Sequence, residues 1–126
     1  MRIKEVMNKA FAIDYDASLK EAAKIIGSRD IGSLVVVDGC KITGIITERD
    51  LIKNITRLDR KISSVMTKQI ITISAEEELD NAAILMAKHK IKKLPVLDNQ
   101  GKLIGILTST DIIAHSDDLN EDFILD

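Results

Sequence analysis

The 126-residue sequence contains no tryptophan, one proline and one cysteine, and its aromatic residues are two phenylalanines and one tyrosine. A single cysteine, Cys40, excludes an internal disulfide, and with the two distant histidines His89 and His115 it supplies too few ligands for a four-coordinate zinc site. So few aromatic rings argue against a stacking surface for single-stranded nucleic acid. No apolar run approaches the roughly 18 residues that a membrane-spanning helix needs, so we expect no membrane partner.

The chain also lacks a large excess of either positive or negative charge. The chain has 18 Lys and Arg against 20 Asp and Glu, which gives a formal net charge of -2. Sequence-independent nucleic-acid binding needs a basic face, so we expect no DNA or RNA partner. The charged N-terminus, MRIKEVMNK, has none of the apolar character of a secretory leader, and we expect a cytoplasmic protein. With 45% hydrophobic residues, the chain can bury a core.

The sequence contains an internal repeat. Residues 19–38 align with residues 79–98 at an offset of 60, and seven of the 20 positions are identical. Residues 41–52 align with residues 102–113 at an offset of 61, and six of 12 positions are identical. Ordinary composition predicts about two matches over such a length. The chain is therefore a tandem duplication, in which Met7 and Met66 open the two copies.

Each copy predicts the same order of elements. Apolar residues recur at helical spacing after Ser18 and after Glu78, and Ser18 with Glu21 has the form of a capping box. Two runs of branched apolar residues joined by a turn follow each helix and predict paired antiparallel strands. The remaining predicted elements are short strands at 12–14 and 71–73, and second helices at 48–55 and 109–114. The pattern is strand, helix, strand, strand, helix.

The most specific motif is Gly, two apolar residues, Thr, two variable residues and Asp, present at 44–50 and again at 105–111. In this order of elements, it closely resembles the cystathionine-beta-synthase (CBS) domain pair, or Bateman module. The resemblance implies a mixed α/β (α+β) fold in which two tandem CBS motifs pack sheet to sheet about a pseudo-twofold axis. We expect CBS motif 1 at 1–60, CBS motif 2 at 61–119 and an acidic C-terminal tail at 120–126.

The resemblance also implies a ligand. Members of this family often bind AMP, ADP, ATP or S-adenosylmethionine in clefts between the two motifs. By that resemblance, Asp50 and Asp111 would accept hydrogen bonds from ribose hydroxyls, and Thr47 and Thr108 would lie near ribose or phosphate. Arg49 would reach a phosphate. Matching positions that often contact the base in the family are Ala12, Ile13, Ile71, Thr72, Lys93, Leu94 and Pro95.

A second interpretation of the same residues is purely structural. Thr47 with Asp50, and Thr108 with Asp111, also have the spacing of capping boxes that close a helix N-terminus. The apolar members of the base-contacting set would serve equally well in a core. The basic run 88–93 (KHKIKK) suits a solvated helix end better than a phosphate or protein site.

We expect no enzyme, since the sequence shows no nucleophile with a base at diagnostic spacing, no metal cluster and no glycine-rich phosphate loop. No cofactor or metal is expected. The favoured function is a regulatory module that binds an adenosine-containing ligand and modulates a partner protein on a separate chain. The alternative is a ligand-independent oligomerisation module. In either case we expect a homodimer, with Leu51, Ile52, Ile112 and Ile113 at its interface.

Overall fold

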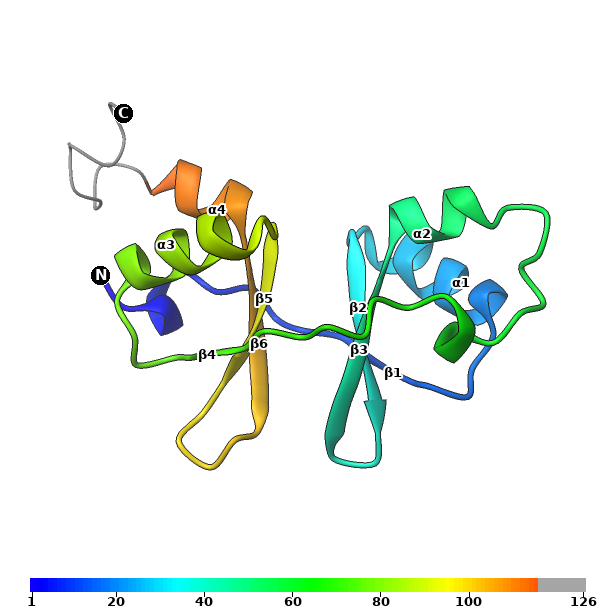
Figure 1. The fold of residues 1–126 in the computed structure, drawn as a ribbon, viewed down its shortest axis with the longest axis horizontal. Coiled ribbons are helices and arrows are strands. Elements are labelled where there is room, and N and C mark those ends of the chain that lie inside the picture. Colours follow the sequence, from blue (N-terminus) through cyan, green and yellow to red (C-terminus); the bar gives the residue numbers. More distant parts are fainter. Residues whose placement is uncertain (116–126) are drawn as a thin grey trace. The chain divides into compact units, whose positions relative to one another are not determined.

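The computed structural model describes residues 1–115, so the acidic tail predicted at 120–126 lies outside the described residues. The first repeat forms a three-stranded sheet and two α-helices, and the second repeat has the same order of elements (Figure 1). The elements are η1 (Ile3–Glu5), β1 (Ala12–Asp14), α1 (Leu19–Arg29), β2 (Ser33–Asp38), β3 (Lys41–Thr47), α2 (Glu48–Lys53), η2 (Ile62–Ser64), β4 (Ile73–Ser74), α3 (Leu79–His89), β5 (Lys93–Leu97), β6 (Leu103–Thr108) and α4 (Ser109–Ala114).

The predicted mixed α/β fold is confirmed. One sheet has the order β1-β2-β3 and the other has the order β4-β5-β6. In each sheet the first strand is parallel to the second, because a helix connects them, and the second and third strands form an antiparallel hairpin. Two element bounds differ from the prediction. The strand expected at 71–73 is Ile73–Ser74, and the helix expected to reach Ile55 ends at Lys53, where the Asn54 side chain donates to the Asp50 carbonyl at 2.8 Å.

Local sequence signals explain where the long helices begin and end. The Ser18 hydroxyl accepts a hydrogen bond from the Glu21 amide at 3.1 Å, which is half of the predicted capping box and fixes the start of α1. The first helix ends at Asp30 and α3 ends at Lys90, both in the left-handed conformation with φ of 53° and 55°. A left-handed residue stops the helix and turns the chain into the following strand.

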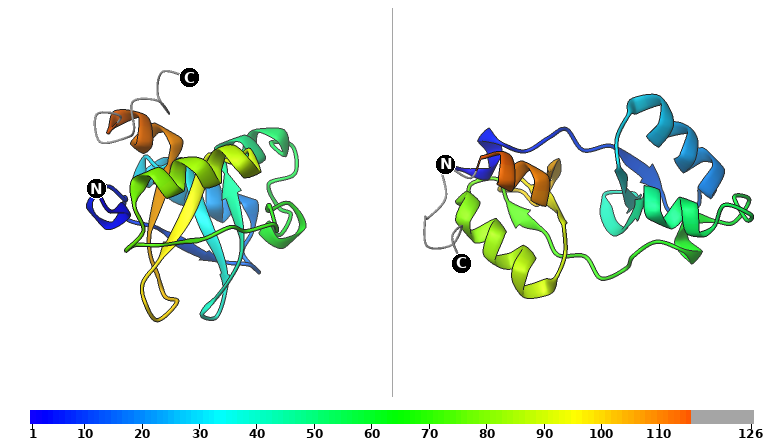
Figure 2. Two further views of the ribbon diagram at one scale, coloured as in Figure 1. Left: turned by 60° about the vertical axis from the view of Figure 1, so that its left-hand side comes forward. Right: turned by 90° about the horizontal axis from the view of Figure 1, so that it is seen from above.

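In each repeat, both helices lie on one face of the sheet (Figures 1 and 2). The apolar side chains between these layers form two separate cores. The first consists of Ile13, Leu19, Ala22, Ile26, Leu34, Val36, Ile46, Leu51 and Ile62. The second consists of Ile3, Val6, Ile73, Ala75, Leu79, Ala82, Ala83, Met86, Leu94, Val96, Leu107 and Ile112. Branched aliphatic residues fill both cores, as the composition predicts.

The compact units do not coincide with the halves of the sequence, because each repeat opens with a segment that packs on the other repeat's sheet. One unit is Phe11–Ile70 and contains the motif ending in Asp50; we call it the Asp50 unit. The other joins Met1–Ala10 to the chain from Ile71 onward, and we call it the Asp111 unit. Ile3 is buried in the core of the Asp111 unit, and its counterpart Ile62 is buried in the core of the Asp50 unit. The repeat boundary expected at 60/61 and the packing boundaries are thus different features.

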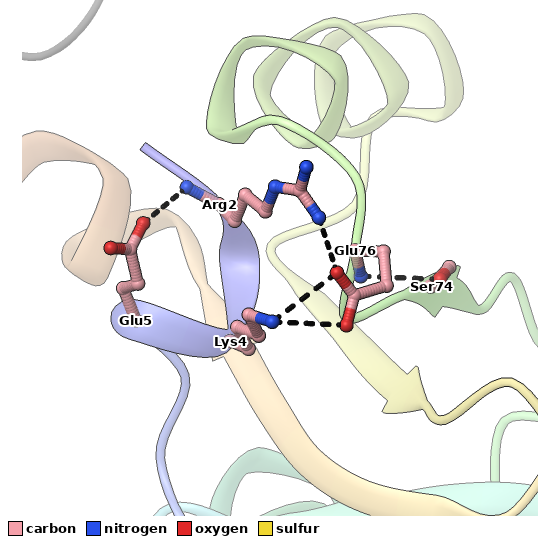
Figure 3. Close-up of polar contacts among 5 residues, drawn as sticks. All are labelled: Arg2, Lys4, Glu5, Ser74 and Glu76. Atoms are coloured by element: carbon pink, nitrogen blue, oxygen red, sulfur yellow. Dashed lines mark hydrogen bonds and ion pairs between the residues drawn. The ribbon is translucent and has the colours of Figure 1, made fainter.

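Ion pairs hold the opening segment of the Asp111 unit at the turn before α3. The side chains of Arg2 and Lys4 both point at the Glu76 carboxylate, and the Lys4 Nζ lies 3.2 Å from Oε1 (Figure 3). The Asp50 unit repeats this arrangement with Lys61 Nζ 2.6 Å from Asp16 Oδ1. Hydrogen bonds from Lys4 and then Arg2 lower the pKa of Glu76, and the hydrogen bond to Asp16 raises the pKa of Lys61.

We predict that Glu76→Gln lowers the melting temperature slightly at neutral pH, since exposed ion pairs contribute little each. Because the folded-state pKa of Glu76 is lowered, its contribution is fully present above the ordinary glutamate pKa and is lost as the pH falls through the lowered value. The melting-temperature difference between parent and variant should therefore close at acid pH and in high salt. Thermal unfolding followed by circular dichroism across pH measures this. Glu21→Gln is the control, and an equal pH dependence in both variants would contradict the prediction.

Candidate functional site

The first Thr–Asp pair lies where β3 passes directly into α2. The Asp50 carboxylate oxygen Oδ2 accepts hydrogen bonds from the Thr47 amide at 2.9 Å and from the Thr47 hydroxyl at 3.0 Å. The Thr47 hydroxyl in turn accepts from the Asp50 amide at 3.3 Å. This is a reciprocal capping box, so the cap expected from the spacing is present. Both side chains are half-buried.

The second Thr–Asp pair, between β6 and α4, has the same cap and one additional contact. The Asp111 oxygen Oδ2 accepts from the Thr108 amide and hydroxyl, both at 2.8 Å. It also accepts a hydrogen bond from the side-chain amide of Asn8 at 2.7 Å. Asn8 belongs to the opening segment of this unit, Met1–Ala10. Within the described residues, no protein group donates to Oδ1 of either aspartate. Each carboxylate thus caps a helix through one oxygen and keeps acceptor capacity on the other.

The neighbouring strand fixes the position of each Thr–Asp pair. Thr47 lies opposite Ser33, and Thr108 lies opposite Lys93, in the two hairpin registers. The first amide of α2 donates to the Gly32 carbonyl at 3.1 Å, and the first amide of α4 donates to the Lys92 carbonyl at 2.9 Å. Of the residues predicted to bind ligand, the structure therefore brings Lys93 beside Thr108, and Arg49 lies exposed in the first turn of α2.

The other predicted ligand-binding residues differ in how much surface they offer. Ala12 is exposed at the start of β1, whereas Ile13 is buried in the core, and β2 separates both from β3. Ile71 and Thr72 are half-buried just before β4. The remaining two lie in β5 and are fully buried: Leu94, with a relative exposure of 0%, and Pro95. These buried residues could meet a ligand only through their backbone groups, and for all of them the ligand role stays a prediction.

The glycine of each motif is required by a close approach of the opening segment. A Cβ on Gly44 would lie 2.6 Å from the Met66 sulfur and 2.8 Å from the Thr67 carbonyl oxygen. A Cβ on Gly105 would lie 2.6 Å from the Met7 sulfur and 2.9 Å from the Asn8 carbonyl oxygen. Two of these four atoms belong to the backbone and have little freedom to move. The motif glycine and the opening methionine of each unit therefore form one packing contact.

The basic run 88–93 spans the end of α3. Lys88 and His89 occupy its last turn, and Lys90 is the left-handed residue that ends it. The first three residues of the run are exposed, as the solvated helix end predicts. Across residues 1–115, no three His, Cys, Asp or Glu side chains are placed to hold a metal ion. No helix among these residues is long and apolar enough to cross a membrane.

Comparison with protein-family models identifies the family. The CBS domain model matches twice, at residues 3–57 and 62–118, and these matches cover most of the chain. The protein therefore belongs to the CBS domain family, and its duplication is a CBS domain pair. This confirms the family predicted from the motif at 44–50 and its copy at 105–111.

One solved structure with the same fold contains bound adenosine derivatives. The crystal structure of the CBS domain pair of protein MJ0100, in complex with 5'-methylthioadenosine and S-adenosyl-L-methionine, matches with a TM-score of 0.83 and 34% identity. The match covers 93% of this chain and 96% of that one. The CBS-domain protein ATU1752 from Agrobacterium tumefaciens matches with a TM-score of 0.79 and 27% identity, over 92% of this chain and 99% of that one.

Relatives in sequence are mostly longer proteins. An uncharacterized protein of Methanocaldococcus jannaschii, MJ1232, is 35% identical over 111 residues, which are 88% of this chain and 36% of the relative. The inosine-5'-monophosphate dehydrogenase of Nitrosopumilus maritimus is 35% identical over 113 residues, which are 89% of this chain and 23% of the enzyme. This chain thus spans about a quarter to a third of these two relatives.

Sequence reasoning missed two features of the site. It did not single out Asn8, because the contact with Asp111 joins residues 103 positions apart and no local pattern announces it. It treated the motif glycines as markers of the family, and their steric role appears only when Met7 and Met66 are placed against them.

We predict that Gly105→Ala and Gly44→Ala each destabilise the protein by about 1–3 kcal/mol, because the new methyl group overpacks against a backbone carbonyl. Urea denaturation followed by circular dichroism gives the free energy of unfolding. Gly27→Ala is the matched control. A Cβ there meets no atom within 4 Å, and alanine in the α1 interior should stabilise by roughly 0.5–1 kcal/mol. Equal stability of Gly105→Ala and the parent would refute the steric argument.

Proposed function

We propose that this CBS domain pair is a regulatory module that binds an adenosine-containing ligand, namely AMP, ADP, ATP or S-adenosylmethionine. The observation that carries the proposal is the likeness to the MJ0100 domain pair, which holds 5'-methylthioadenosine and S-adenosylmethionine. Both of those ligands are adenosine derivatives. The duplicated Thr–Asp pairs supply the chemistry that such ligands need.

The free acceptor capacity of the aspartates supports ribose recognition. An ionised carboxylate accepts hydrogen bonds and cannot donate, so it suits the two hydroxyl donors of a ribose. In this proposal Asp50 and Asp111 bind ribose, while Thr47, Thr108 and Arg49 lie near ribose or phosphate. The capping bonds do not compete with this role, because they use Oδ2 and leave Oδ1 open.

The capping geometry favours a second candidate, a ligand-independent interaction module. Both Thr–Asp pairs are complete capping boxes, and a cap needs no ligand to account for its residues. Under this alternative the duplication has copied a structural device. Ligand titration separates the two candidates.

We further propose that the module is not an enzyme and acts on a partner protein. Relatives such as inosine-5'-monophosphate dehydrogenase carry a matching segment as a minor part of a longer chain. A binding module of this kind changes a partner only by the difference in ligand affinity between the partner's two states. We infer a cytoplasmic protein, consistent with a single cysteine that stands exposed in the β2–β3 turn.

We predict that at least one of AMP, ADP, ATP, S-adenosylmethionine and 5'-methylthioadenosine binds and raises the melting temperature. Asp111→Ala should weaken binding at its site by about 10- to 150-fold, the range expected for hydrogen bonds to a charged acceptor. Without ligand, the lost cap should cost on the order of 1 kcal/mol of stability. A thermal-shift screen followed by calorimetry on the parent, Asp50→Ala and Asp111→Ala measures both effects.

The two outcomes separate the candidates. Weaker binding with a modest loss of stability supports the ligand site. Unchanged affinity in both aspartate variants, or no heat from any of the five compounds with the parent, would leave only the capping interpretation.

We also propose that the module forms a homodimer through exposed isoleucines of its short helices. Ile52 on α2 and Ile113 on α4 have relative exposures of 69% and 72%, unusually high for large apolar side chains. The prediction that Leu51 and Ile112 also face a partner is wrong. Both are core residues, with exposures of 7% and 6%.

We predict that the 13.9 kDa chain scatters light as a dimer at tens of micromolar, and that Ile52→Asp with Ile113→Asp gives a monomer. A charged group in an apolar interface loses its hydration without a partner, which opposes association. The control is Ile84→Asp, which places the same change on the exposed face of α3. A monomeric parent, or a dimer that persists in the double variant, would contradict the proposed interface.

A further inference from the structure

The segment that joins the long helix to the hairpin carries a different charge in each unit. In the Asp111 unit it is the basic run 88–93 (KHKIKK), which contains four lysines and no acidic residue. In the Asp50 unit the aligned segment is 28–33 (SRDIGS), where the charges of Arg29 and Asp30 cancel. Each segment runs from the end of its long helix to the first residue of the next strand. One place in the fold is therefore strongly basic in one unit and neutral in the other.

The basic run ends directly beside the Thr–Asp pair of its unit. The Lys92 carbonyl accepts a hydrogen bond from the Ser109 amide at 2.9 Å, and Lys93 lies opposite Thr108 in the hairpin. Side chains of opposite residues in an antiparallel pair point to the same face of the sheet, with Cβ atoms about 4.5–5.5 Å apart. The long Lys93 side chain is half-buried there. Positive charge thus belongs to the surroundings of the Asp111 carboxylate.

The Asp50 unit has the same backbone arrangement without this charge. The Gly32 carbonyl accepts a hydrogen bond from the Glu48 amide at 3.1 Å, and Ser33 lies opposite Thr47. A hydroxyl therefore occupies the position that an ammonium group occupies in the other unit. The equivalent backbone contacts make the two positions directly comparable.

The short helices do not reverse this difference. In the first turn of α2, the charges of the exposed residues Glu48 and Arg49 cancel. Their counterparts in α4 are Ser109 and Thr110, which carry no charge. Lys53 is in the last turn of α2, further along the helix than Asp50. The run 88–93 thus makes the surroundings of Asp111 more positive than those of Asp50.

The ligands of the proposed function differ mainly in the charge of the group at the ribose 5' position. The phosphate of AMP carries a charge of about −1.5 to −2 at neutral pH. S-adenosylmethionine carries a sulfonium and an ammonium group against one carboxylate, and 5'-methylthioadenosine is uncharged. A nearby ammonium group attracts a phosphate and repels a sulfonium, and salt screens this effect over about 10 Å. The lysines closest to the Thr–Asp pair therefore matter most.

We propose that the basic run 88–93 divides these ligands between two sites, named here after their aspartates. The Asp111 site selects adenosine ligands with an anionic 5' group, such as AMP, ADP and ATP. The Asp50 site selects uncharged or cationic ones, such as 5'-methylthioadenosine and S-adenosylmethionine. Lys93 contributes most, because it lies opposite Thr108. The inference rests on the proposed function, since it assigns a ligand class to each of the same two aspartates.

The test first isolates each site. Asp50→Ala leaves the Asp111 site, and Asp111→Ala leaves the Asp50 site. Each protein is titrated calorimetrically with AMP and with 5'-methylthioadenosine, which share the adenosine and differ in the 5' group. At the Asp111 site AMP should bind at least about 10-fold more tightly at low salt, and this preference should shrink at high salt. At the Asp50 site 5'-methylthioadenosine should bind at least as tightly as AMP.

Exchange of the opposed side chains should then shift the preference in both directions. In the Asp50→Ala protein, Lys93→Ser should lower the preference for AMP over 5'-methylthioadenosine by about 3- to 10-fold. In the Asp111→Ala protein, Ser33→Lys should raise it by a similar factor. The readout is a ratio of two dissociation constants, so damage to the fold that weakens both ligands equally cancels. Lys102→Ser is the matched control in the Asp50→Ala protein, because it removes the same charge in the β5–β6 turn, at the far end of β6 from Thr108.

Other results would overturn the inference. These are an equal preference at the two sites, an unchanged preference in Lys93→Ser, or a loss of preference in Lys102→Ser as large as that in Lys93→Ser. Failure of the proposed function looks different. In that case the parent gives no heat with either compound or with S-adenosylmethionine, or neither aspartate variant changes the affinity, and the inference fails with it.

Discussion

Burial of the two opening segments completes both hydrophobic cores. Ile3 is fully buried among side chains from α3, β5 and β6, and Ile62 is fully buried among those from α1, β2 and β3. A sheet of three strands with two short helices has a small core, and each such apolar side chain contributes about 1.5–3 kcal/mol when buried. Because each repeat supplies the segment that completes the other's core, neither half of the sequence is a complete structural unit.

The same exchange positions the candidate site. Once Ile3 and Val6 are buried, Met7 reaches the surface of Gly105, and Asn8 forms a bridge with Ile106. A glycine is needed where the methionine crosses the sheet, since any side chain there would collide with it. The polar end of this crossing is the hydrogen bond from Asn8 to Asp111. One continuous segment of six residues, from Ile3 to Asn8, thus links the core of the Asp111 unit to Asp111.

In the proposed function, each aspartate combines a structural role with a binding role. Each carboxylate joins a strand to a helix through a box that satisfies first-turn donors, which contributes to stability with no ligand present. That use also fixes the orientation of the carboxylate, and under the proposed function a carboxylate that is already held in place loses less entropy on binding a hydroxyl donor. A cap and the proposed ribose acceptor are therefore compatible roles for one carboxylate.

Much of this protein follows from the sequence by itself. The local signals are the hydrophobic periodicity, the turn between the two paired strands of each repeat and the duplicated motifs. They predict the element order, the hairpins, the helix starts and the family. Thr47–Asp50 and Thr108–Asp111 are capping boxes at a fixed spacing of three residues, so their geometry too is readable from the chain.

Only the tertiary structure decides which segments complete which core, and which side chain reaches which aspartate. Met1–Ala10 belongs with the second sheet because apolar burial depends on proximity in space, not on proximity in the sequence. Leu51 and Ile52 are neighbours of similar hydrophobicity, and only the packing of α2 makes one a core residue and the other a surface residue. Asn8 meets Asp111 for the same reason: a long-range hydrogen bond leaves no periodic trace in the sequence, because nothing local requires its donor.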